Sequence, residues 1–264
     1  NLAKAIVDSA VGKNVDIVAV MSMEERGITQ GSIHDRFYQL EEEAKRLTRR
    51  NQNYQFSKIG ANILAIETPT ENGKIKDVYI LNAQGVITLD DDKRGDFIVV
   101  GSNQIPNHLK LEEALKMCND SGLITLAKSP FRKLYAINPK LCEKVASKFD
   151  GIIYTSEASQ EENKKTREFA KQIGLNQIPI SNSHTIRDIG KGKIIFDARE
   201  IRDVTELVQN LWEVVRSQPQ RFSRHLDYQS KASGLSRKIP LKAYGIYWEA
   251  LGKMLHGIMR ESEF

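Results

Sequence analysis

Short apolar runs alternate with segments of helical periodicity along most of this 264-residue chain, and this alternation limits the folds it can adopt. The runs are mostly continuous Val, Ile and Leu, which is typical of parallel strands buried on both faces. Between them, apolar residues recur at helical spacing, as at Phe37, Leu40, Ala44 and Leu47. This order predicts an α/β fold, specifically a β/α barrel in place of an open sheet, with a C-terminal helical extension. The predicted strands cover residues 15–20, 63–66, 76–81, 97–100, 123–127, 151–154, 177–180 and 193–196.

Local signals mark a hairpin and two helix ends. Asn72 and Gly73 lie between two strand-like runs, and Asn-Gly is a strong signal for a hairpin turn. Gly122 and Gly174 directly follow helical stretches, where glycine commonly ends a helix. These positions predict where the chain reverses.

The alternation stops near Ser217 and divides the chain into two predicted parts. Residues 1–216 are expected to form the barrel. Residues 217–240 are rich in Ser, Gln, Pro and Gly and are expected to be a linker. Beyond Pro240, apolar and aromatic residues recur at helical spacing over residues 244–258, which predicts a last helix packed on the barrel. The alternative is that this helix docks a partner protein.

Composition excludes several classes of protein. No run reaches the roughly 18 apolar residues that a membrane span needs, and the mean hydropathy is −0.43. Asp8, Lys13 and Asp16 interrupt the apolar stretch near the N-terminus, so no signal peptide is predicted. Two cysteines, Cys118 and Cys142, cannot build a disulfide framework, and neither is expected to be a reactive thiol. An intracellular location, cytoplasmic or nuclear, is therefore predicted.

The positive charge is concentrated in one segment. The chain has a formal net charge of +5, yet residues 216–242 hold seven cations and one acid. Phe222, His225 and Tyr228 are interspersed, so that aromatic rings could stack on bases while cations meet phosphates. The segment predicts contact with nucleic acid or another polyanion, and a solvated linker is the alternative. The candidate nucleic-acid-binding residues are Arg216, Arg221, Arg224, Lys231, Arg237, Lys238 and Lys242.

Three segments, in chain order, carry a resemblance to a known family. They are residues 2–24 (LAKAIVDSAVGKNVDIVAVMSME), residues 111–131 (LEEALKMCNDSGLITLAKSPF) and residues 149–190 (FDGIIYTSEASQEENKKTREFAKQIGLNQIPISNSHTIRDIG). They resemble the segments of polymerase-and-histidinol-phosphatase (PHP) domains that end in TDH, AHP and SDAH motifs. The resemblance implies an irregular, TIM-like β/α barrel of about seven strands, with its site at the C-terminal ends of the strands. It also implies phosphoester hydrolysis by two or three divalent ions held by His, Asp and Glu.

Most of the metal ligands that the resemblance implies are replaced. The residues at the three motif positions are Met21, Ser22 and Met23; Lys128, Ser129 and Pro130; and Ser181, Asn182, Ser183 and His184. Lys128 thus stands where the family has a ligand histidine. Only His184 and Glu67, which ends the run ILAIE, match the ligand set. Because multinuclear metal sites need more donors than two, the family's metal centre is predicted to be lost, with no cofactor bound.

Two roles are open for the residues that remain. Lys128 follows a buried strand and needs a partner, and Glu67 is one candidate, giving an ion pair in place of metals. The other partner is a phosphate, because hydroxyls and an amide near a lysine can donate hydrogen bonds to an anion. The candidate phosphate-binding residues are Lys128, Ser129, Ser181, Asn182, Ser183 and His184.

Three functions follow. The preferred one is a PHP-like phosphoesterase fold that acts as a binding or structural module with nucleic acid or another phosphate-bearing partner. The second is an active phosphoric ester hydrolase or nuclease that uses Mn, Zn or Mg in a remodelled site built from Glu24, His34, Glu67 and His184. The third is a scaffold subunit that docks through the helix at residues 244–258.

Overall fold

The computed structural model describes residues 1–23, 36–90, 93–102, 104–132, 136–181, 186–196 and 222–226. All of them lie within one compact unit, Asn1–Asp227, which has a mixed α/β fold as predicted. Residues 197–221 and 227–264, and with them the predicted last helix at residues 244–258, lie outside the described residues. The helices are α1 (Leu2–Gly12), α2 (Arg36–Arg50), α3 (Leu111–Asp120), α4 (Pro139–Lys144) and α5 (Gln160–Gln172), with 3-10 turns η1 (Ala146–Lys148) and η2 (Ile186–Asp188).

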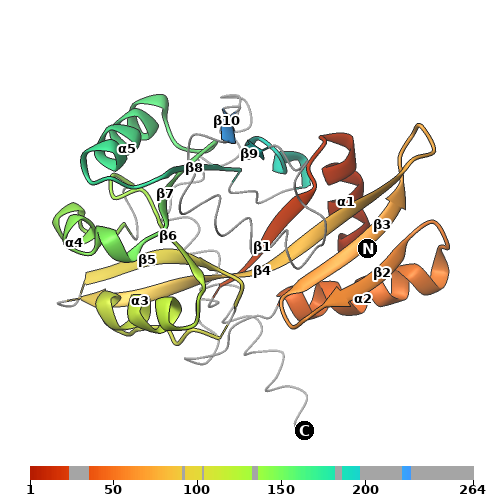
Figure 1. Cartoon of the computed structure of the whole chain (residues 1–264), viewed down its shortest axis with the longest axis horizontal. Coiled ribbons are helices and arrows are strands. Elements are labelled where there is room, and N and C mark those ends of the chain that lie inside the picture. The colour runs from red at the N-terminus through yellow and green to blue at the C-terminus, as the bar shows by residue number, and fades with distance from the viewer. Residues whose placement is uncertain are drawn as a thin grey trace, which may run out of the picture. The chain divides into compact units, whose positions relative to one another are not determined.

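Eight of the strands form one sheet, in the order β2-β3-β4-β5-β6-β7-β8, with β1 paired to β4 (Figure 1). The β1–β4, β6–β7 and β7–β8 pairs are parallel, and the other four pairs of this sheet are antiparallel. A separate antiparallel pair joins β9 and β10. The strands are β1 (Ile17–Met23), β2 (Gln55–Ile59), β3 (Ile63–Pro69), β4 (Ile75–Asp90), β5 (Lys93–Val100), β6 (Ile124–Ala127), β7 (Gly151–Thr155), β8 (Gln177–Ile180), β9 (Gly192–Phe196) and β10 (Phe222–Leu226).

The 16-residue strand β4 organises the sheet. Strand β3 pairs with its residues 75–81, β5 pairs with residues 83–90, and β1 pairs with residues 79–85. Because the β1 pairing overlaps both of the others, β1 occupies one edge of β4 while β3 and β5 follow one another along the opposite edge. The predicted hairpin at Asn72 and Gly73 is confirmed. There Gly73 has a φ of +72° and its amide donates to the Thr70 carbonyl oxygen.

The described strands form an open sheet and not the closed barrel that the sequence predicted. Strands β2 and β8 end the path and do not pair with one another. All eight predicted strands are present, but the expectation of parallel pairing was wrong for β3 and β5, which pair antiparallel with β4, whereas β1 pairs with β4 in parallel. Their apolar runs are continuous because helices cover one face of the sheet and a central core covers the other.

One face of the sheet surrounds a central core that draws on strands far apart in the pairing order. Ile17 of β1, Ile98 of β5, Ile178 of β8 and Ile194 of β9 belong to the same apolar cluster. The opposite face carries two clusters, one beneath α3, α4 and α5 and one beneath α1 and α2 (Figure 1). The sheet is therefore curved around its central core although its hydrogen-bonded ladder is open.

Strand β9 packs against β8 at a glycine. A Cβ atom on Gly192 would lie 2.3 Å from the carbonyl carbon of Ile180, so no side chain fits there. Strand β10 then pairs with β9, with Phe222 opposite Phe196. Residues 222–226 thus form a strand within the segment that was predicted to be an irregular linker. Short strands that pair only at a sheet margin leave little periodic signal in the sequence.

Capping and ion pairs fix the helices. Gly122 and Gly174 have φ values of +67° and +74° just past α3 and α5, which confirms the predicted helix ends. On α2, the Glu41 carboxylate accepts from Lys45 Nζ at 2.8 Å and from Lys58 Nζ at 2.7 Å. These hydrogen bonds hold the pKa of Glu41 below its usual value. In the part of the chain that the structure describes, no helix is both long and apolar enough to cross a membrane.

Candidate functional site

The strands β6, β7 and β8 run parallel, and polar residues follow the carboxyl end of each. Strands β7 and β8 end level with one another, at Thr155 and Ile180, whereas β6 ends at Ala127, which is opposite Ile152 of β7. Lys128 and Ser129 follow β6, Ser156 follows β7 and Ser181 follows β8. The carboxyl ends of parallel strands are where α/β folds usually place their sites. We therefore treat this edge, together with the start of β5 beside it, as the candidate site.

Lys128 is held by a buried carboxylate. Its Nζ lies 2.6 Å from Oδ2 of Asp96, and the two side chains are 11% and 4% exposed. The register explains the pairing: Phe97 faces Ala127 across β5 and β6, so Asp96 and Lys128 come next along the same two strands. The other carboxylate oxygen of Asp96, Oδ1, is buried and has no hydrogen-bond partner. The pair is thus an almost completely desolvated ion pair with one unsatisfied oxygen.

The predicted pairing of Lys128 with Glu67 is wrong. Glu67 is exposed on β3, where it faces Gln55 on one side and Asp77 on the other. Asp96 was not among the site residues predicted from the sequence. A signal was present, because an aspartate opens the apolar run of β5, FIVV, and a lone charge at the buried end of a strand needs a partner.

Ser129 links β6 to α5. Its side chain is 2% exposed, and its Oγ lies 2.6 Å from Oγ1 of Thr166. Ser129 Oγ also accepts from the Phe131 amide at 3.3 Å, and Thr166 Oγ1 donates to the Glu162 carbonyl oxygen at 2.8 Å. The hydroxyl of Ser129 is therefore engaged in holding a helix on the sheet.

The serines that follow β7 and β8 hold neighbouring strands together. Ser156 Oγ donates to the Ser181 carbonyl oxygen at 2.8 Å. Ser181 Oγ donates to the Gly192 carbonyl oxygen at 3.1 Å and accepts from the Gly192 amide at 3.0 Å. Asn182, Ser183 and His184 lie outside the described residues, so the phosphate-binding set stays a prediction. Its described members all have partners within the protein.

The charge at this edge is not that of an anion site. Arg132 Nη2 lies 3.8 Å from Glu157 Oε2, and Arg132 Nε lies 3.9 Å from Glu162 Oε1. Burial raises the pKa of Glu162, and Arg132 acts in the opposite direction. With Asp96 and Lys128 included, described acids outnumber described cations here. An incoming phosphate would be repelled unless it displaced a carboxylate from its cation.

The residues described at the implied ligand positions do not fit a divalent-metal centre. Met21 offers only a thioether, which is a poor ligand for Mn²⁺ or Mg²⁺. Ser22 is fully buried on the face of β1 that carries Val18 and Val20 toward α1 and α2, away from the central core, and its Oγ has no partner. Lys128 brings a positive charge. Within the described ranges, no group of three or more His, Cys, Asp or Glu side chains converges to hold a metal. Glu24 and His34, which were predicted for the remodelled metal site, lie outside those ranges.

Both cysteines are buried and free, as the sequence predicted. Burial raises the pKa of the Cys118 thiol to about 12, with a smaller contribution from Asp150, and burial alone raises the pKa of Cys142 to about 12. Since the thiolate is the nucleophile, neither cysteine supplies chemistry near neutral pH.

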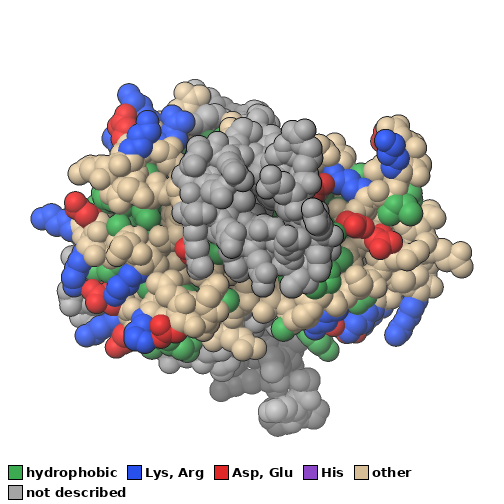
Figure 2. Space-filling view, in the orientation of Figure 1, with side chains coloured by type: hydrophobic (Ala, Val, Ile, Leu, Met, Phe, Trp, Pro, Cys, Tyr) green, Lys and Arg blue, Asp and Glu red, His purple; other side chains and the backbone are tan. Residues whose placement is uncertain are grey.

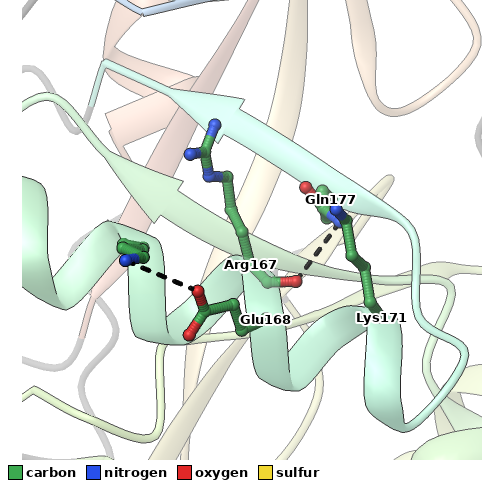
Figure 3. A pocket seen from close by; sticks show the side chains of 5 residues that line it. Arg167, Glu168, Lys171 and Gln177 are labelled. Atoms are coloured by element: carbon green, nitrogen blue, oxygen red, sulfur yellow. Dashed lines mark hydrogen bonds and ion pairs between the residues drawn. The ribbon is translucent and has the colours of Figure 1, made fainter.

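A second polar feature lies on the outside of α5. Lys164, Arg167, Glu168, Lys171 and Gln177 line a shallow open pocket with a volume of about 250 Å³ (Figure 3). In Figure 2, Lys and Arg side chains gather over the region of α5 at the upper left, with acidic side chains among them. Helix α5 carries Glu161, Glu162 and Glu168 beside its cations. Of the seven candidate nucleic-acid-binding residues, Arg224 is the one within the described residues, and it lies beside this pocket: its Nε donates to the Gln177 carbonyl oxygen at 2.7 Å.

The comparisons with known proteins agree with the PHP resemblance. Residues 160–213 match the family model described as PHP-associated, a segment that begins with α5 and includes β8 and β9. This match confirms the resemblance to the PHP superfamily that the three sequence segments predicted. Among solved structures, PsfC from Pseudomonas syringae PB-5123 is similar, with a TM-score of 0.54 and 16% identity over 94% of this chain and 89% of that chain. At this identity the likeness establishes a shared fold alone. No curated protein matches the sequence.

Proposed function

We propose that this chain is a PHP-like protein that binds a phosphate-bearing partner, nucleic acid in the first place, and does not carry out metal-dependent hydrolysis. The observation that carries the proposal is the Lys128–Asp96 pair. Lys128 replaces the ligand histidine that the resemblance implies. Its Nζ lies 2.6 Å from Oδ2 of the buried Asp96 carboxylate. An ammonium at that distance both competes for the carboxylate and repels a divalent cation.

Structural roles of the neighbouring hydroxyls support the same proposal. The hydroxyl of Ser129 is hydrogen-bonded to α5, that of Ser156 to the residue that follows β8, and that of Ser181 to β9. The edge that holds metals in the family is thus built here as a set of internal contacts. We place the role of the protein in binding, on surfaces outside this edge.

A barrel-like arrangement is part of the proposal. Strands β1, β5, β8 and β9 contribute side chains to one central core. A barrel whose ladder is interrupted between β1 and β8 would keep such a shared core. Two contacts bridge that opening: Lys193 Nζ donates to the Lys13 carbonyl oxygen at 3.2 Å, and Gly190 packs against Val15. The fold then keeps the general form of the family while its site is rebuilt.

Metal analysis of the full chain, combined with a hydrolysis assay, tests the proposal. The protein is equilibrated with Mn²⁺, Zn²⁺ or Mg²⁺, passed through a desalting column, and analysed by plasma mass spectrometry. Hydrolysis of bis(p-nitrophenyl) phosphate and p-nitrophenyl phosphate is measured with the same ions. We expect substoichiometric metal and no stimulated turnover above that of a His184→Ala variant. Stoichiometric metal together with turnover that His184→Ala abolishes would establish the active phosphoesterase instead.

A further inference from the structure

Three cations form one exposed stripe along α5. Lys164, Arg167 and Lys171 are spaced by three and four residues, so they lie on the same side of the helix. All three are exposed, whereas Thr166 and Ala170 on the opposite side are buried against the sheet. Figure 3 shows the side chains of Arg167 and Lys171 extending from α5 toward β8.

Strands β8 and β10 extend this stripe with a fourth cation. Gln177 Nε2 donates to the Arg167 carbonyl oxygen at 3.3 Å, which fixes β8 beside the helix. Arg224 Nε donates to the Gln177 carbonyl oxygen at 2.7 Å, which brings the exposed Arg224 of β10 to the same place. Glu168 is the acid in the pocket, and its carboxylate lies 3.9 Å from Lys164 Nζ. We call Lys164, Arg167, Lys171 and Arg224 the α5–β10 basic surface.

We infer that the α5–β10 basic surface is the place where this protein binds the phosphate backbone of a nucleic acid. This inference rests on the proposed function and gives its binding role a location. Guanidinium groups match the geometry of phosphate oxygens, and lysines add charge without demanding a fixed orientation. The Arg167 guanidinium, 5.9 Å from the Tyr154 ring centre, is steadied against the sheet and loses less freedom when it binds.

Two features favour nucleic acid over an anionic membrane. The exposed large hydrophobic side chains of the described residues are Leu2, Tyr38, Ile75, Leu89, Met117 and Phe131, and none lies on α5 or β8. A membrane-binding surface usually adds apolar side chains that enter the bilayer. In addition, β10 lies within the basic segment 216–242, so the chain on both sides of Arg224 carries further cations interspersed with aromatic residues.

A charge-removal variant of the full chain tests the inference. Lys164→Gln/Arg167→Gln/Lys171→Gln removes three charges and keeps polar side chains of similar length. The matched control is Arg46→Gln/Arg49→Gln/Arg50→Gln on α2, which removes the same net charge elsewhere. Binding of fluorescein-labelled single-stranded and duplex oligonucleotides is followed by anisotropy at 50 mM and 200 mM NaCl. Circular dichroism verifies that both variants are folded.

We expect the α5 variant to lose affinity and salt dependence together. Each phosphate contact contributes about 0.7 to 0.9 to the slope of log affinity against log salt. Three lost contacts therefore reduce the affinity change between the two salt concentrations by about 20- to 40-fold. The α2 control is expected to keep the slope of the unmodified chain. Arg224→Gln is expected to lower the slope by the contribution of one phosphate contact, about 0.7 to 0.9.

Other outcomes overturn the inference. If the α5 variant keeps the affinity and the salt slope of the unmodified chain, the nucleic acid binds elsewhere. If the α2 control loses as much affinity as the α5 variant, the loss follows from net charge and not from the α5–β10 basic surface. Binding to phosphatidylserine vesicles without binding to either oligonucleotide assigns the surface to membranes. Each of these results leaves the proposed absence of metal-dependent hydrolysis intact. Metal-dependent turnover of the unmodified chain, together with a reduced salt slope in the α5 variant, would refute the proposed function while the basic surface stands.

Discussion

Removing the ammonium of Lys128 should cost far more stability than removing any surface lysine. Lys128→Met keeps the length of the side chain and leaves Asp96 buried, with neither carboxylate oxygen paired. Breaking a buried pair in this way costs about 3–5 kcal/mol, because the remaining charge is uncompensated. Because 11% of the Lys128 side chain is exposed, water can partly solvate the unpaired charge. The expected loss of unfolding free energy is therefore at the lower end, about 3 kcal/mol.

An apolar replacement of both partners should restore most of that loss. Asp96 shares its face of the sheet with Ile98 and Val100, so Asp96→Leu/Lys128→Met extends an apolar surface that already exists. Replacing a buried ion pair by hydrophobic residues is often neutral or stabilising. We expect the free energy of unfolding of the double variant to lie within about 1 kcal/mol of that of the unmodified chain.

Urea unfolding followed by far-ultraviolet circular dichroism measures these differences. Lys116→Met is the matched control, because Lys116 pairs with Asp120 at 2.5 Å with both side chains more than half exposed. Such surface pairs contribute about 0–1 kcal/mol. The account of the pair fails if Lys128→Met costs no more than Lys116→Met. It also fails if the double variant is as unstable as Lys128→Met, since the loss would then not come from an unpaired charge.

Three further substitutions test the account. Gly192→Ala should destabilise by more than about 2 kcal/mol in urea unfolding, because its Cβ would overlap the Ile180 carbonyl group and separate β9 from β8; an unaffected variant would contradict that packing. Ser22→Ala should leave stability unchanged or raise it by about 1 kcal/mol, since it removes a buried hydroxyl without a partner; a large loss would reveal a role for the hydroxyl. Glu41→Gln should cost about 1 kcal/mol at pH 7. The depressed pKa of Glu41 means that its contribution is present above the unfolded-state value of about 4.3 and is lost as the pH falls through the folded-state value. The difference from the unmodified chain should therefore shrink as the pH is lowered below the unfolded-state value, and a difference that stays constant would contradict this expectation.

Local chemistry in the sequence predicted the elements, and long-range pairing decided the sheet. The eight apolar runs, the Asn72–Gly73 turn and the glycines at 122 and 174 each act through neighbouring residues, and all are present. Whether β4 pairs with β3 in parallel or antiparallel depends on contacts that apolar composition does not encode. Full burial on both faces produced the parallel expectation, because continuous Val and Ile runs occur wherever both faces are covered.

The candidate site was predictable in part. The sequence identified Lys128 as a buried cation in need of a partner, which the structure confirms. It offered Glu67 and a phosphate as the two candidate partners, because it compared positions in a family motif, whereas the pairing with Asp96 follows from the register between β5 and β6. In the same way, only the fold brings Arg224 beside the α5 cations, which precede it in the chain by more than 50 residues.

Crystals of the full chain grown with excess Mn²⁺ provide the most direct measurement of the central claim. An anomalous difference map recorded near the manganese edge locates any bound ion without reference to activity. We predict that Lys128 Nζ remains within hydrogen-bonding distance of Asp96 and that no anomalous peak appears at the carboxyl ends of β6, β7 and β8. A manganese peak coordinated by Asp96, with Lys128 turned away, would contradict the account.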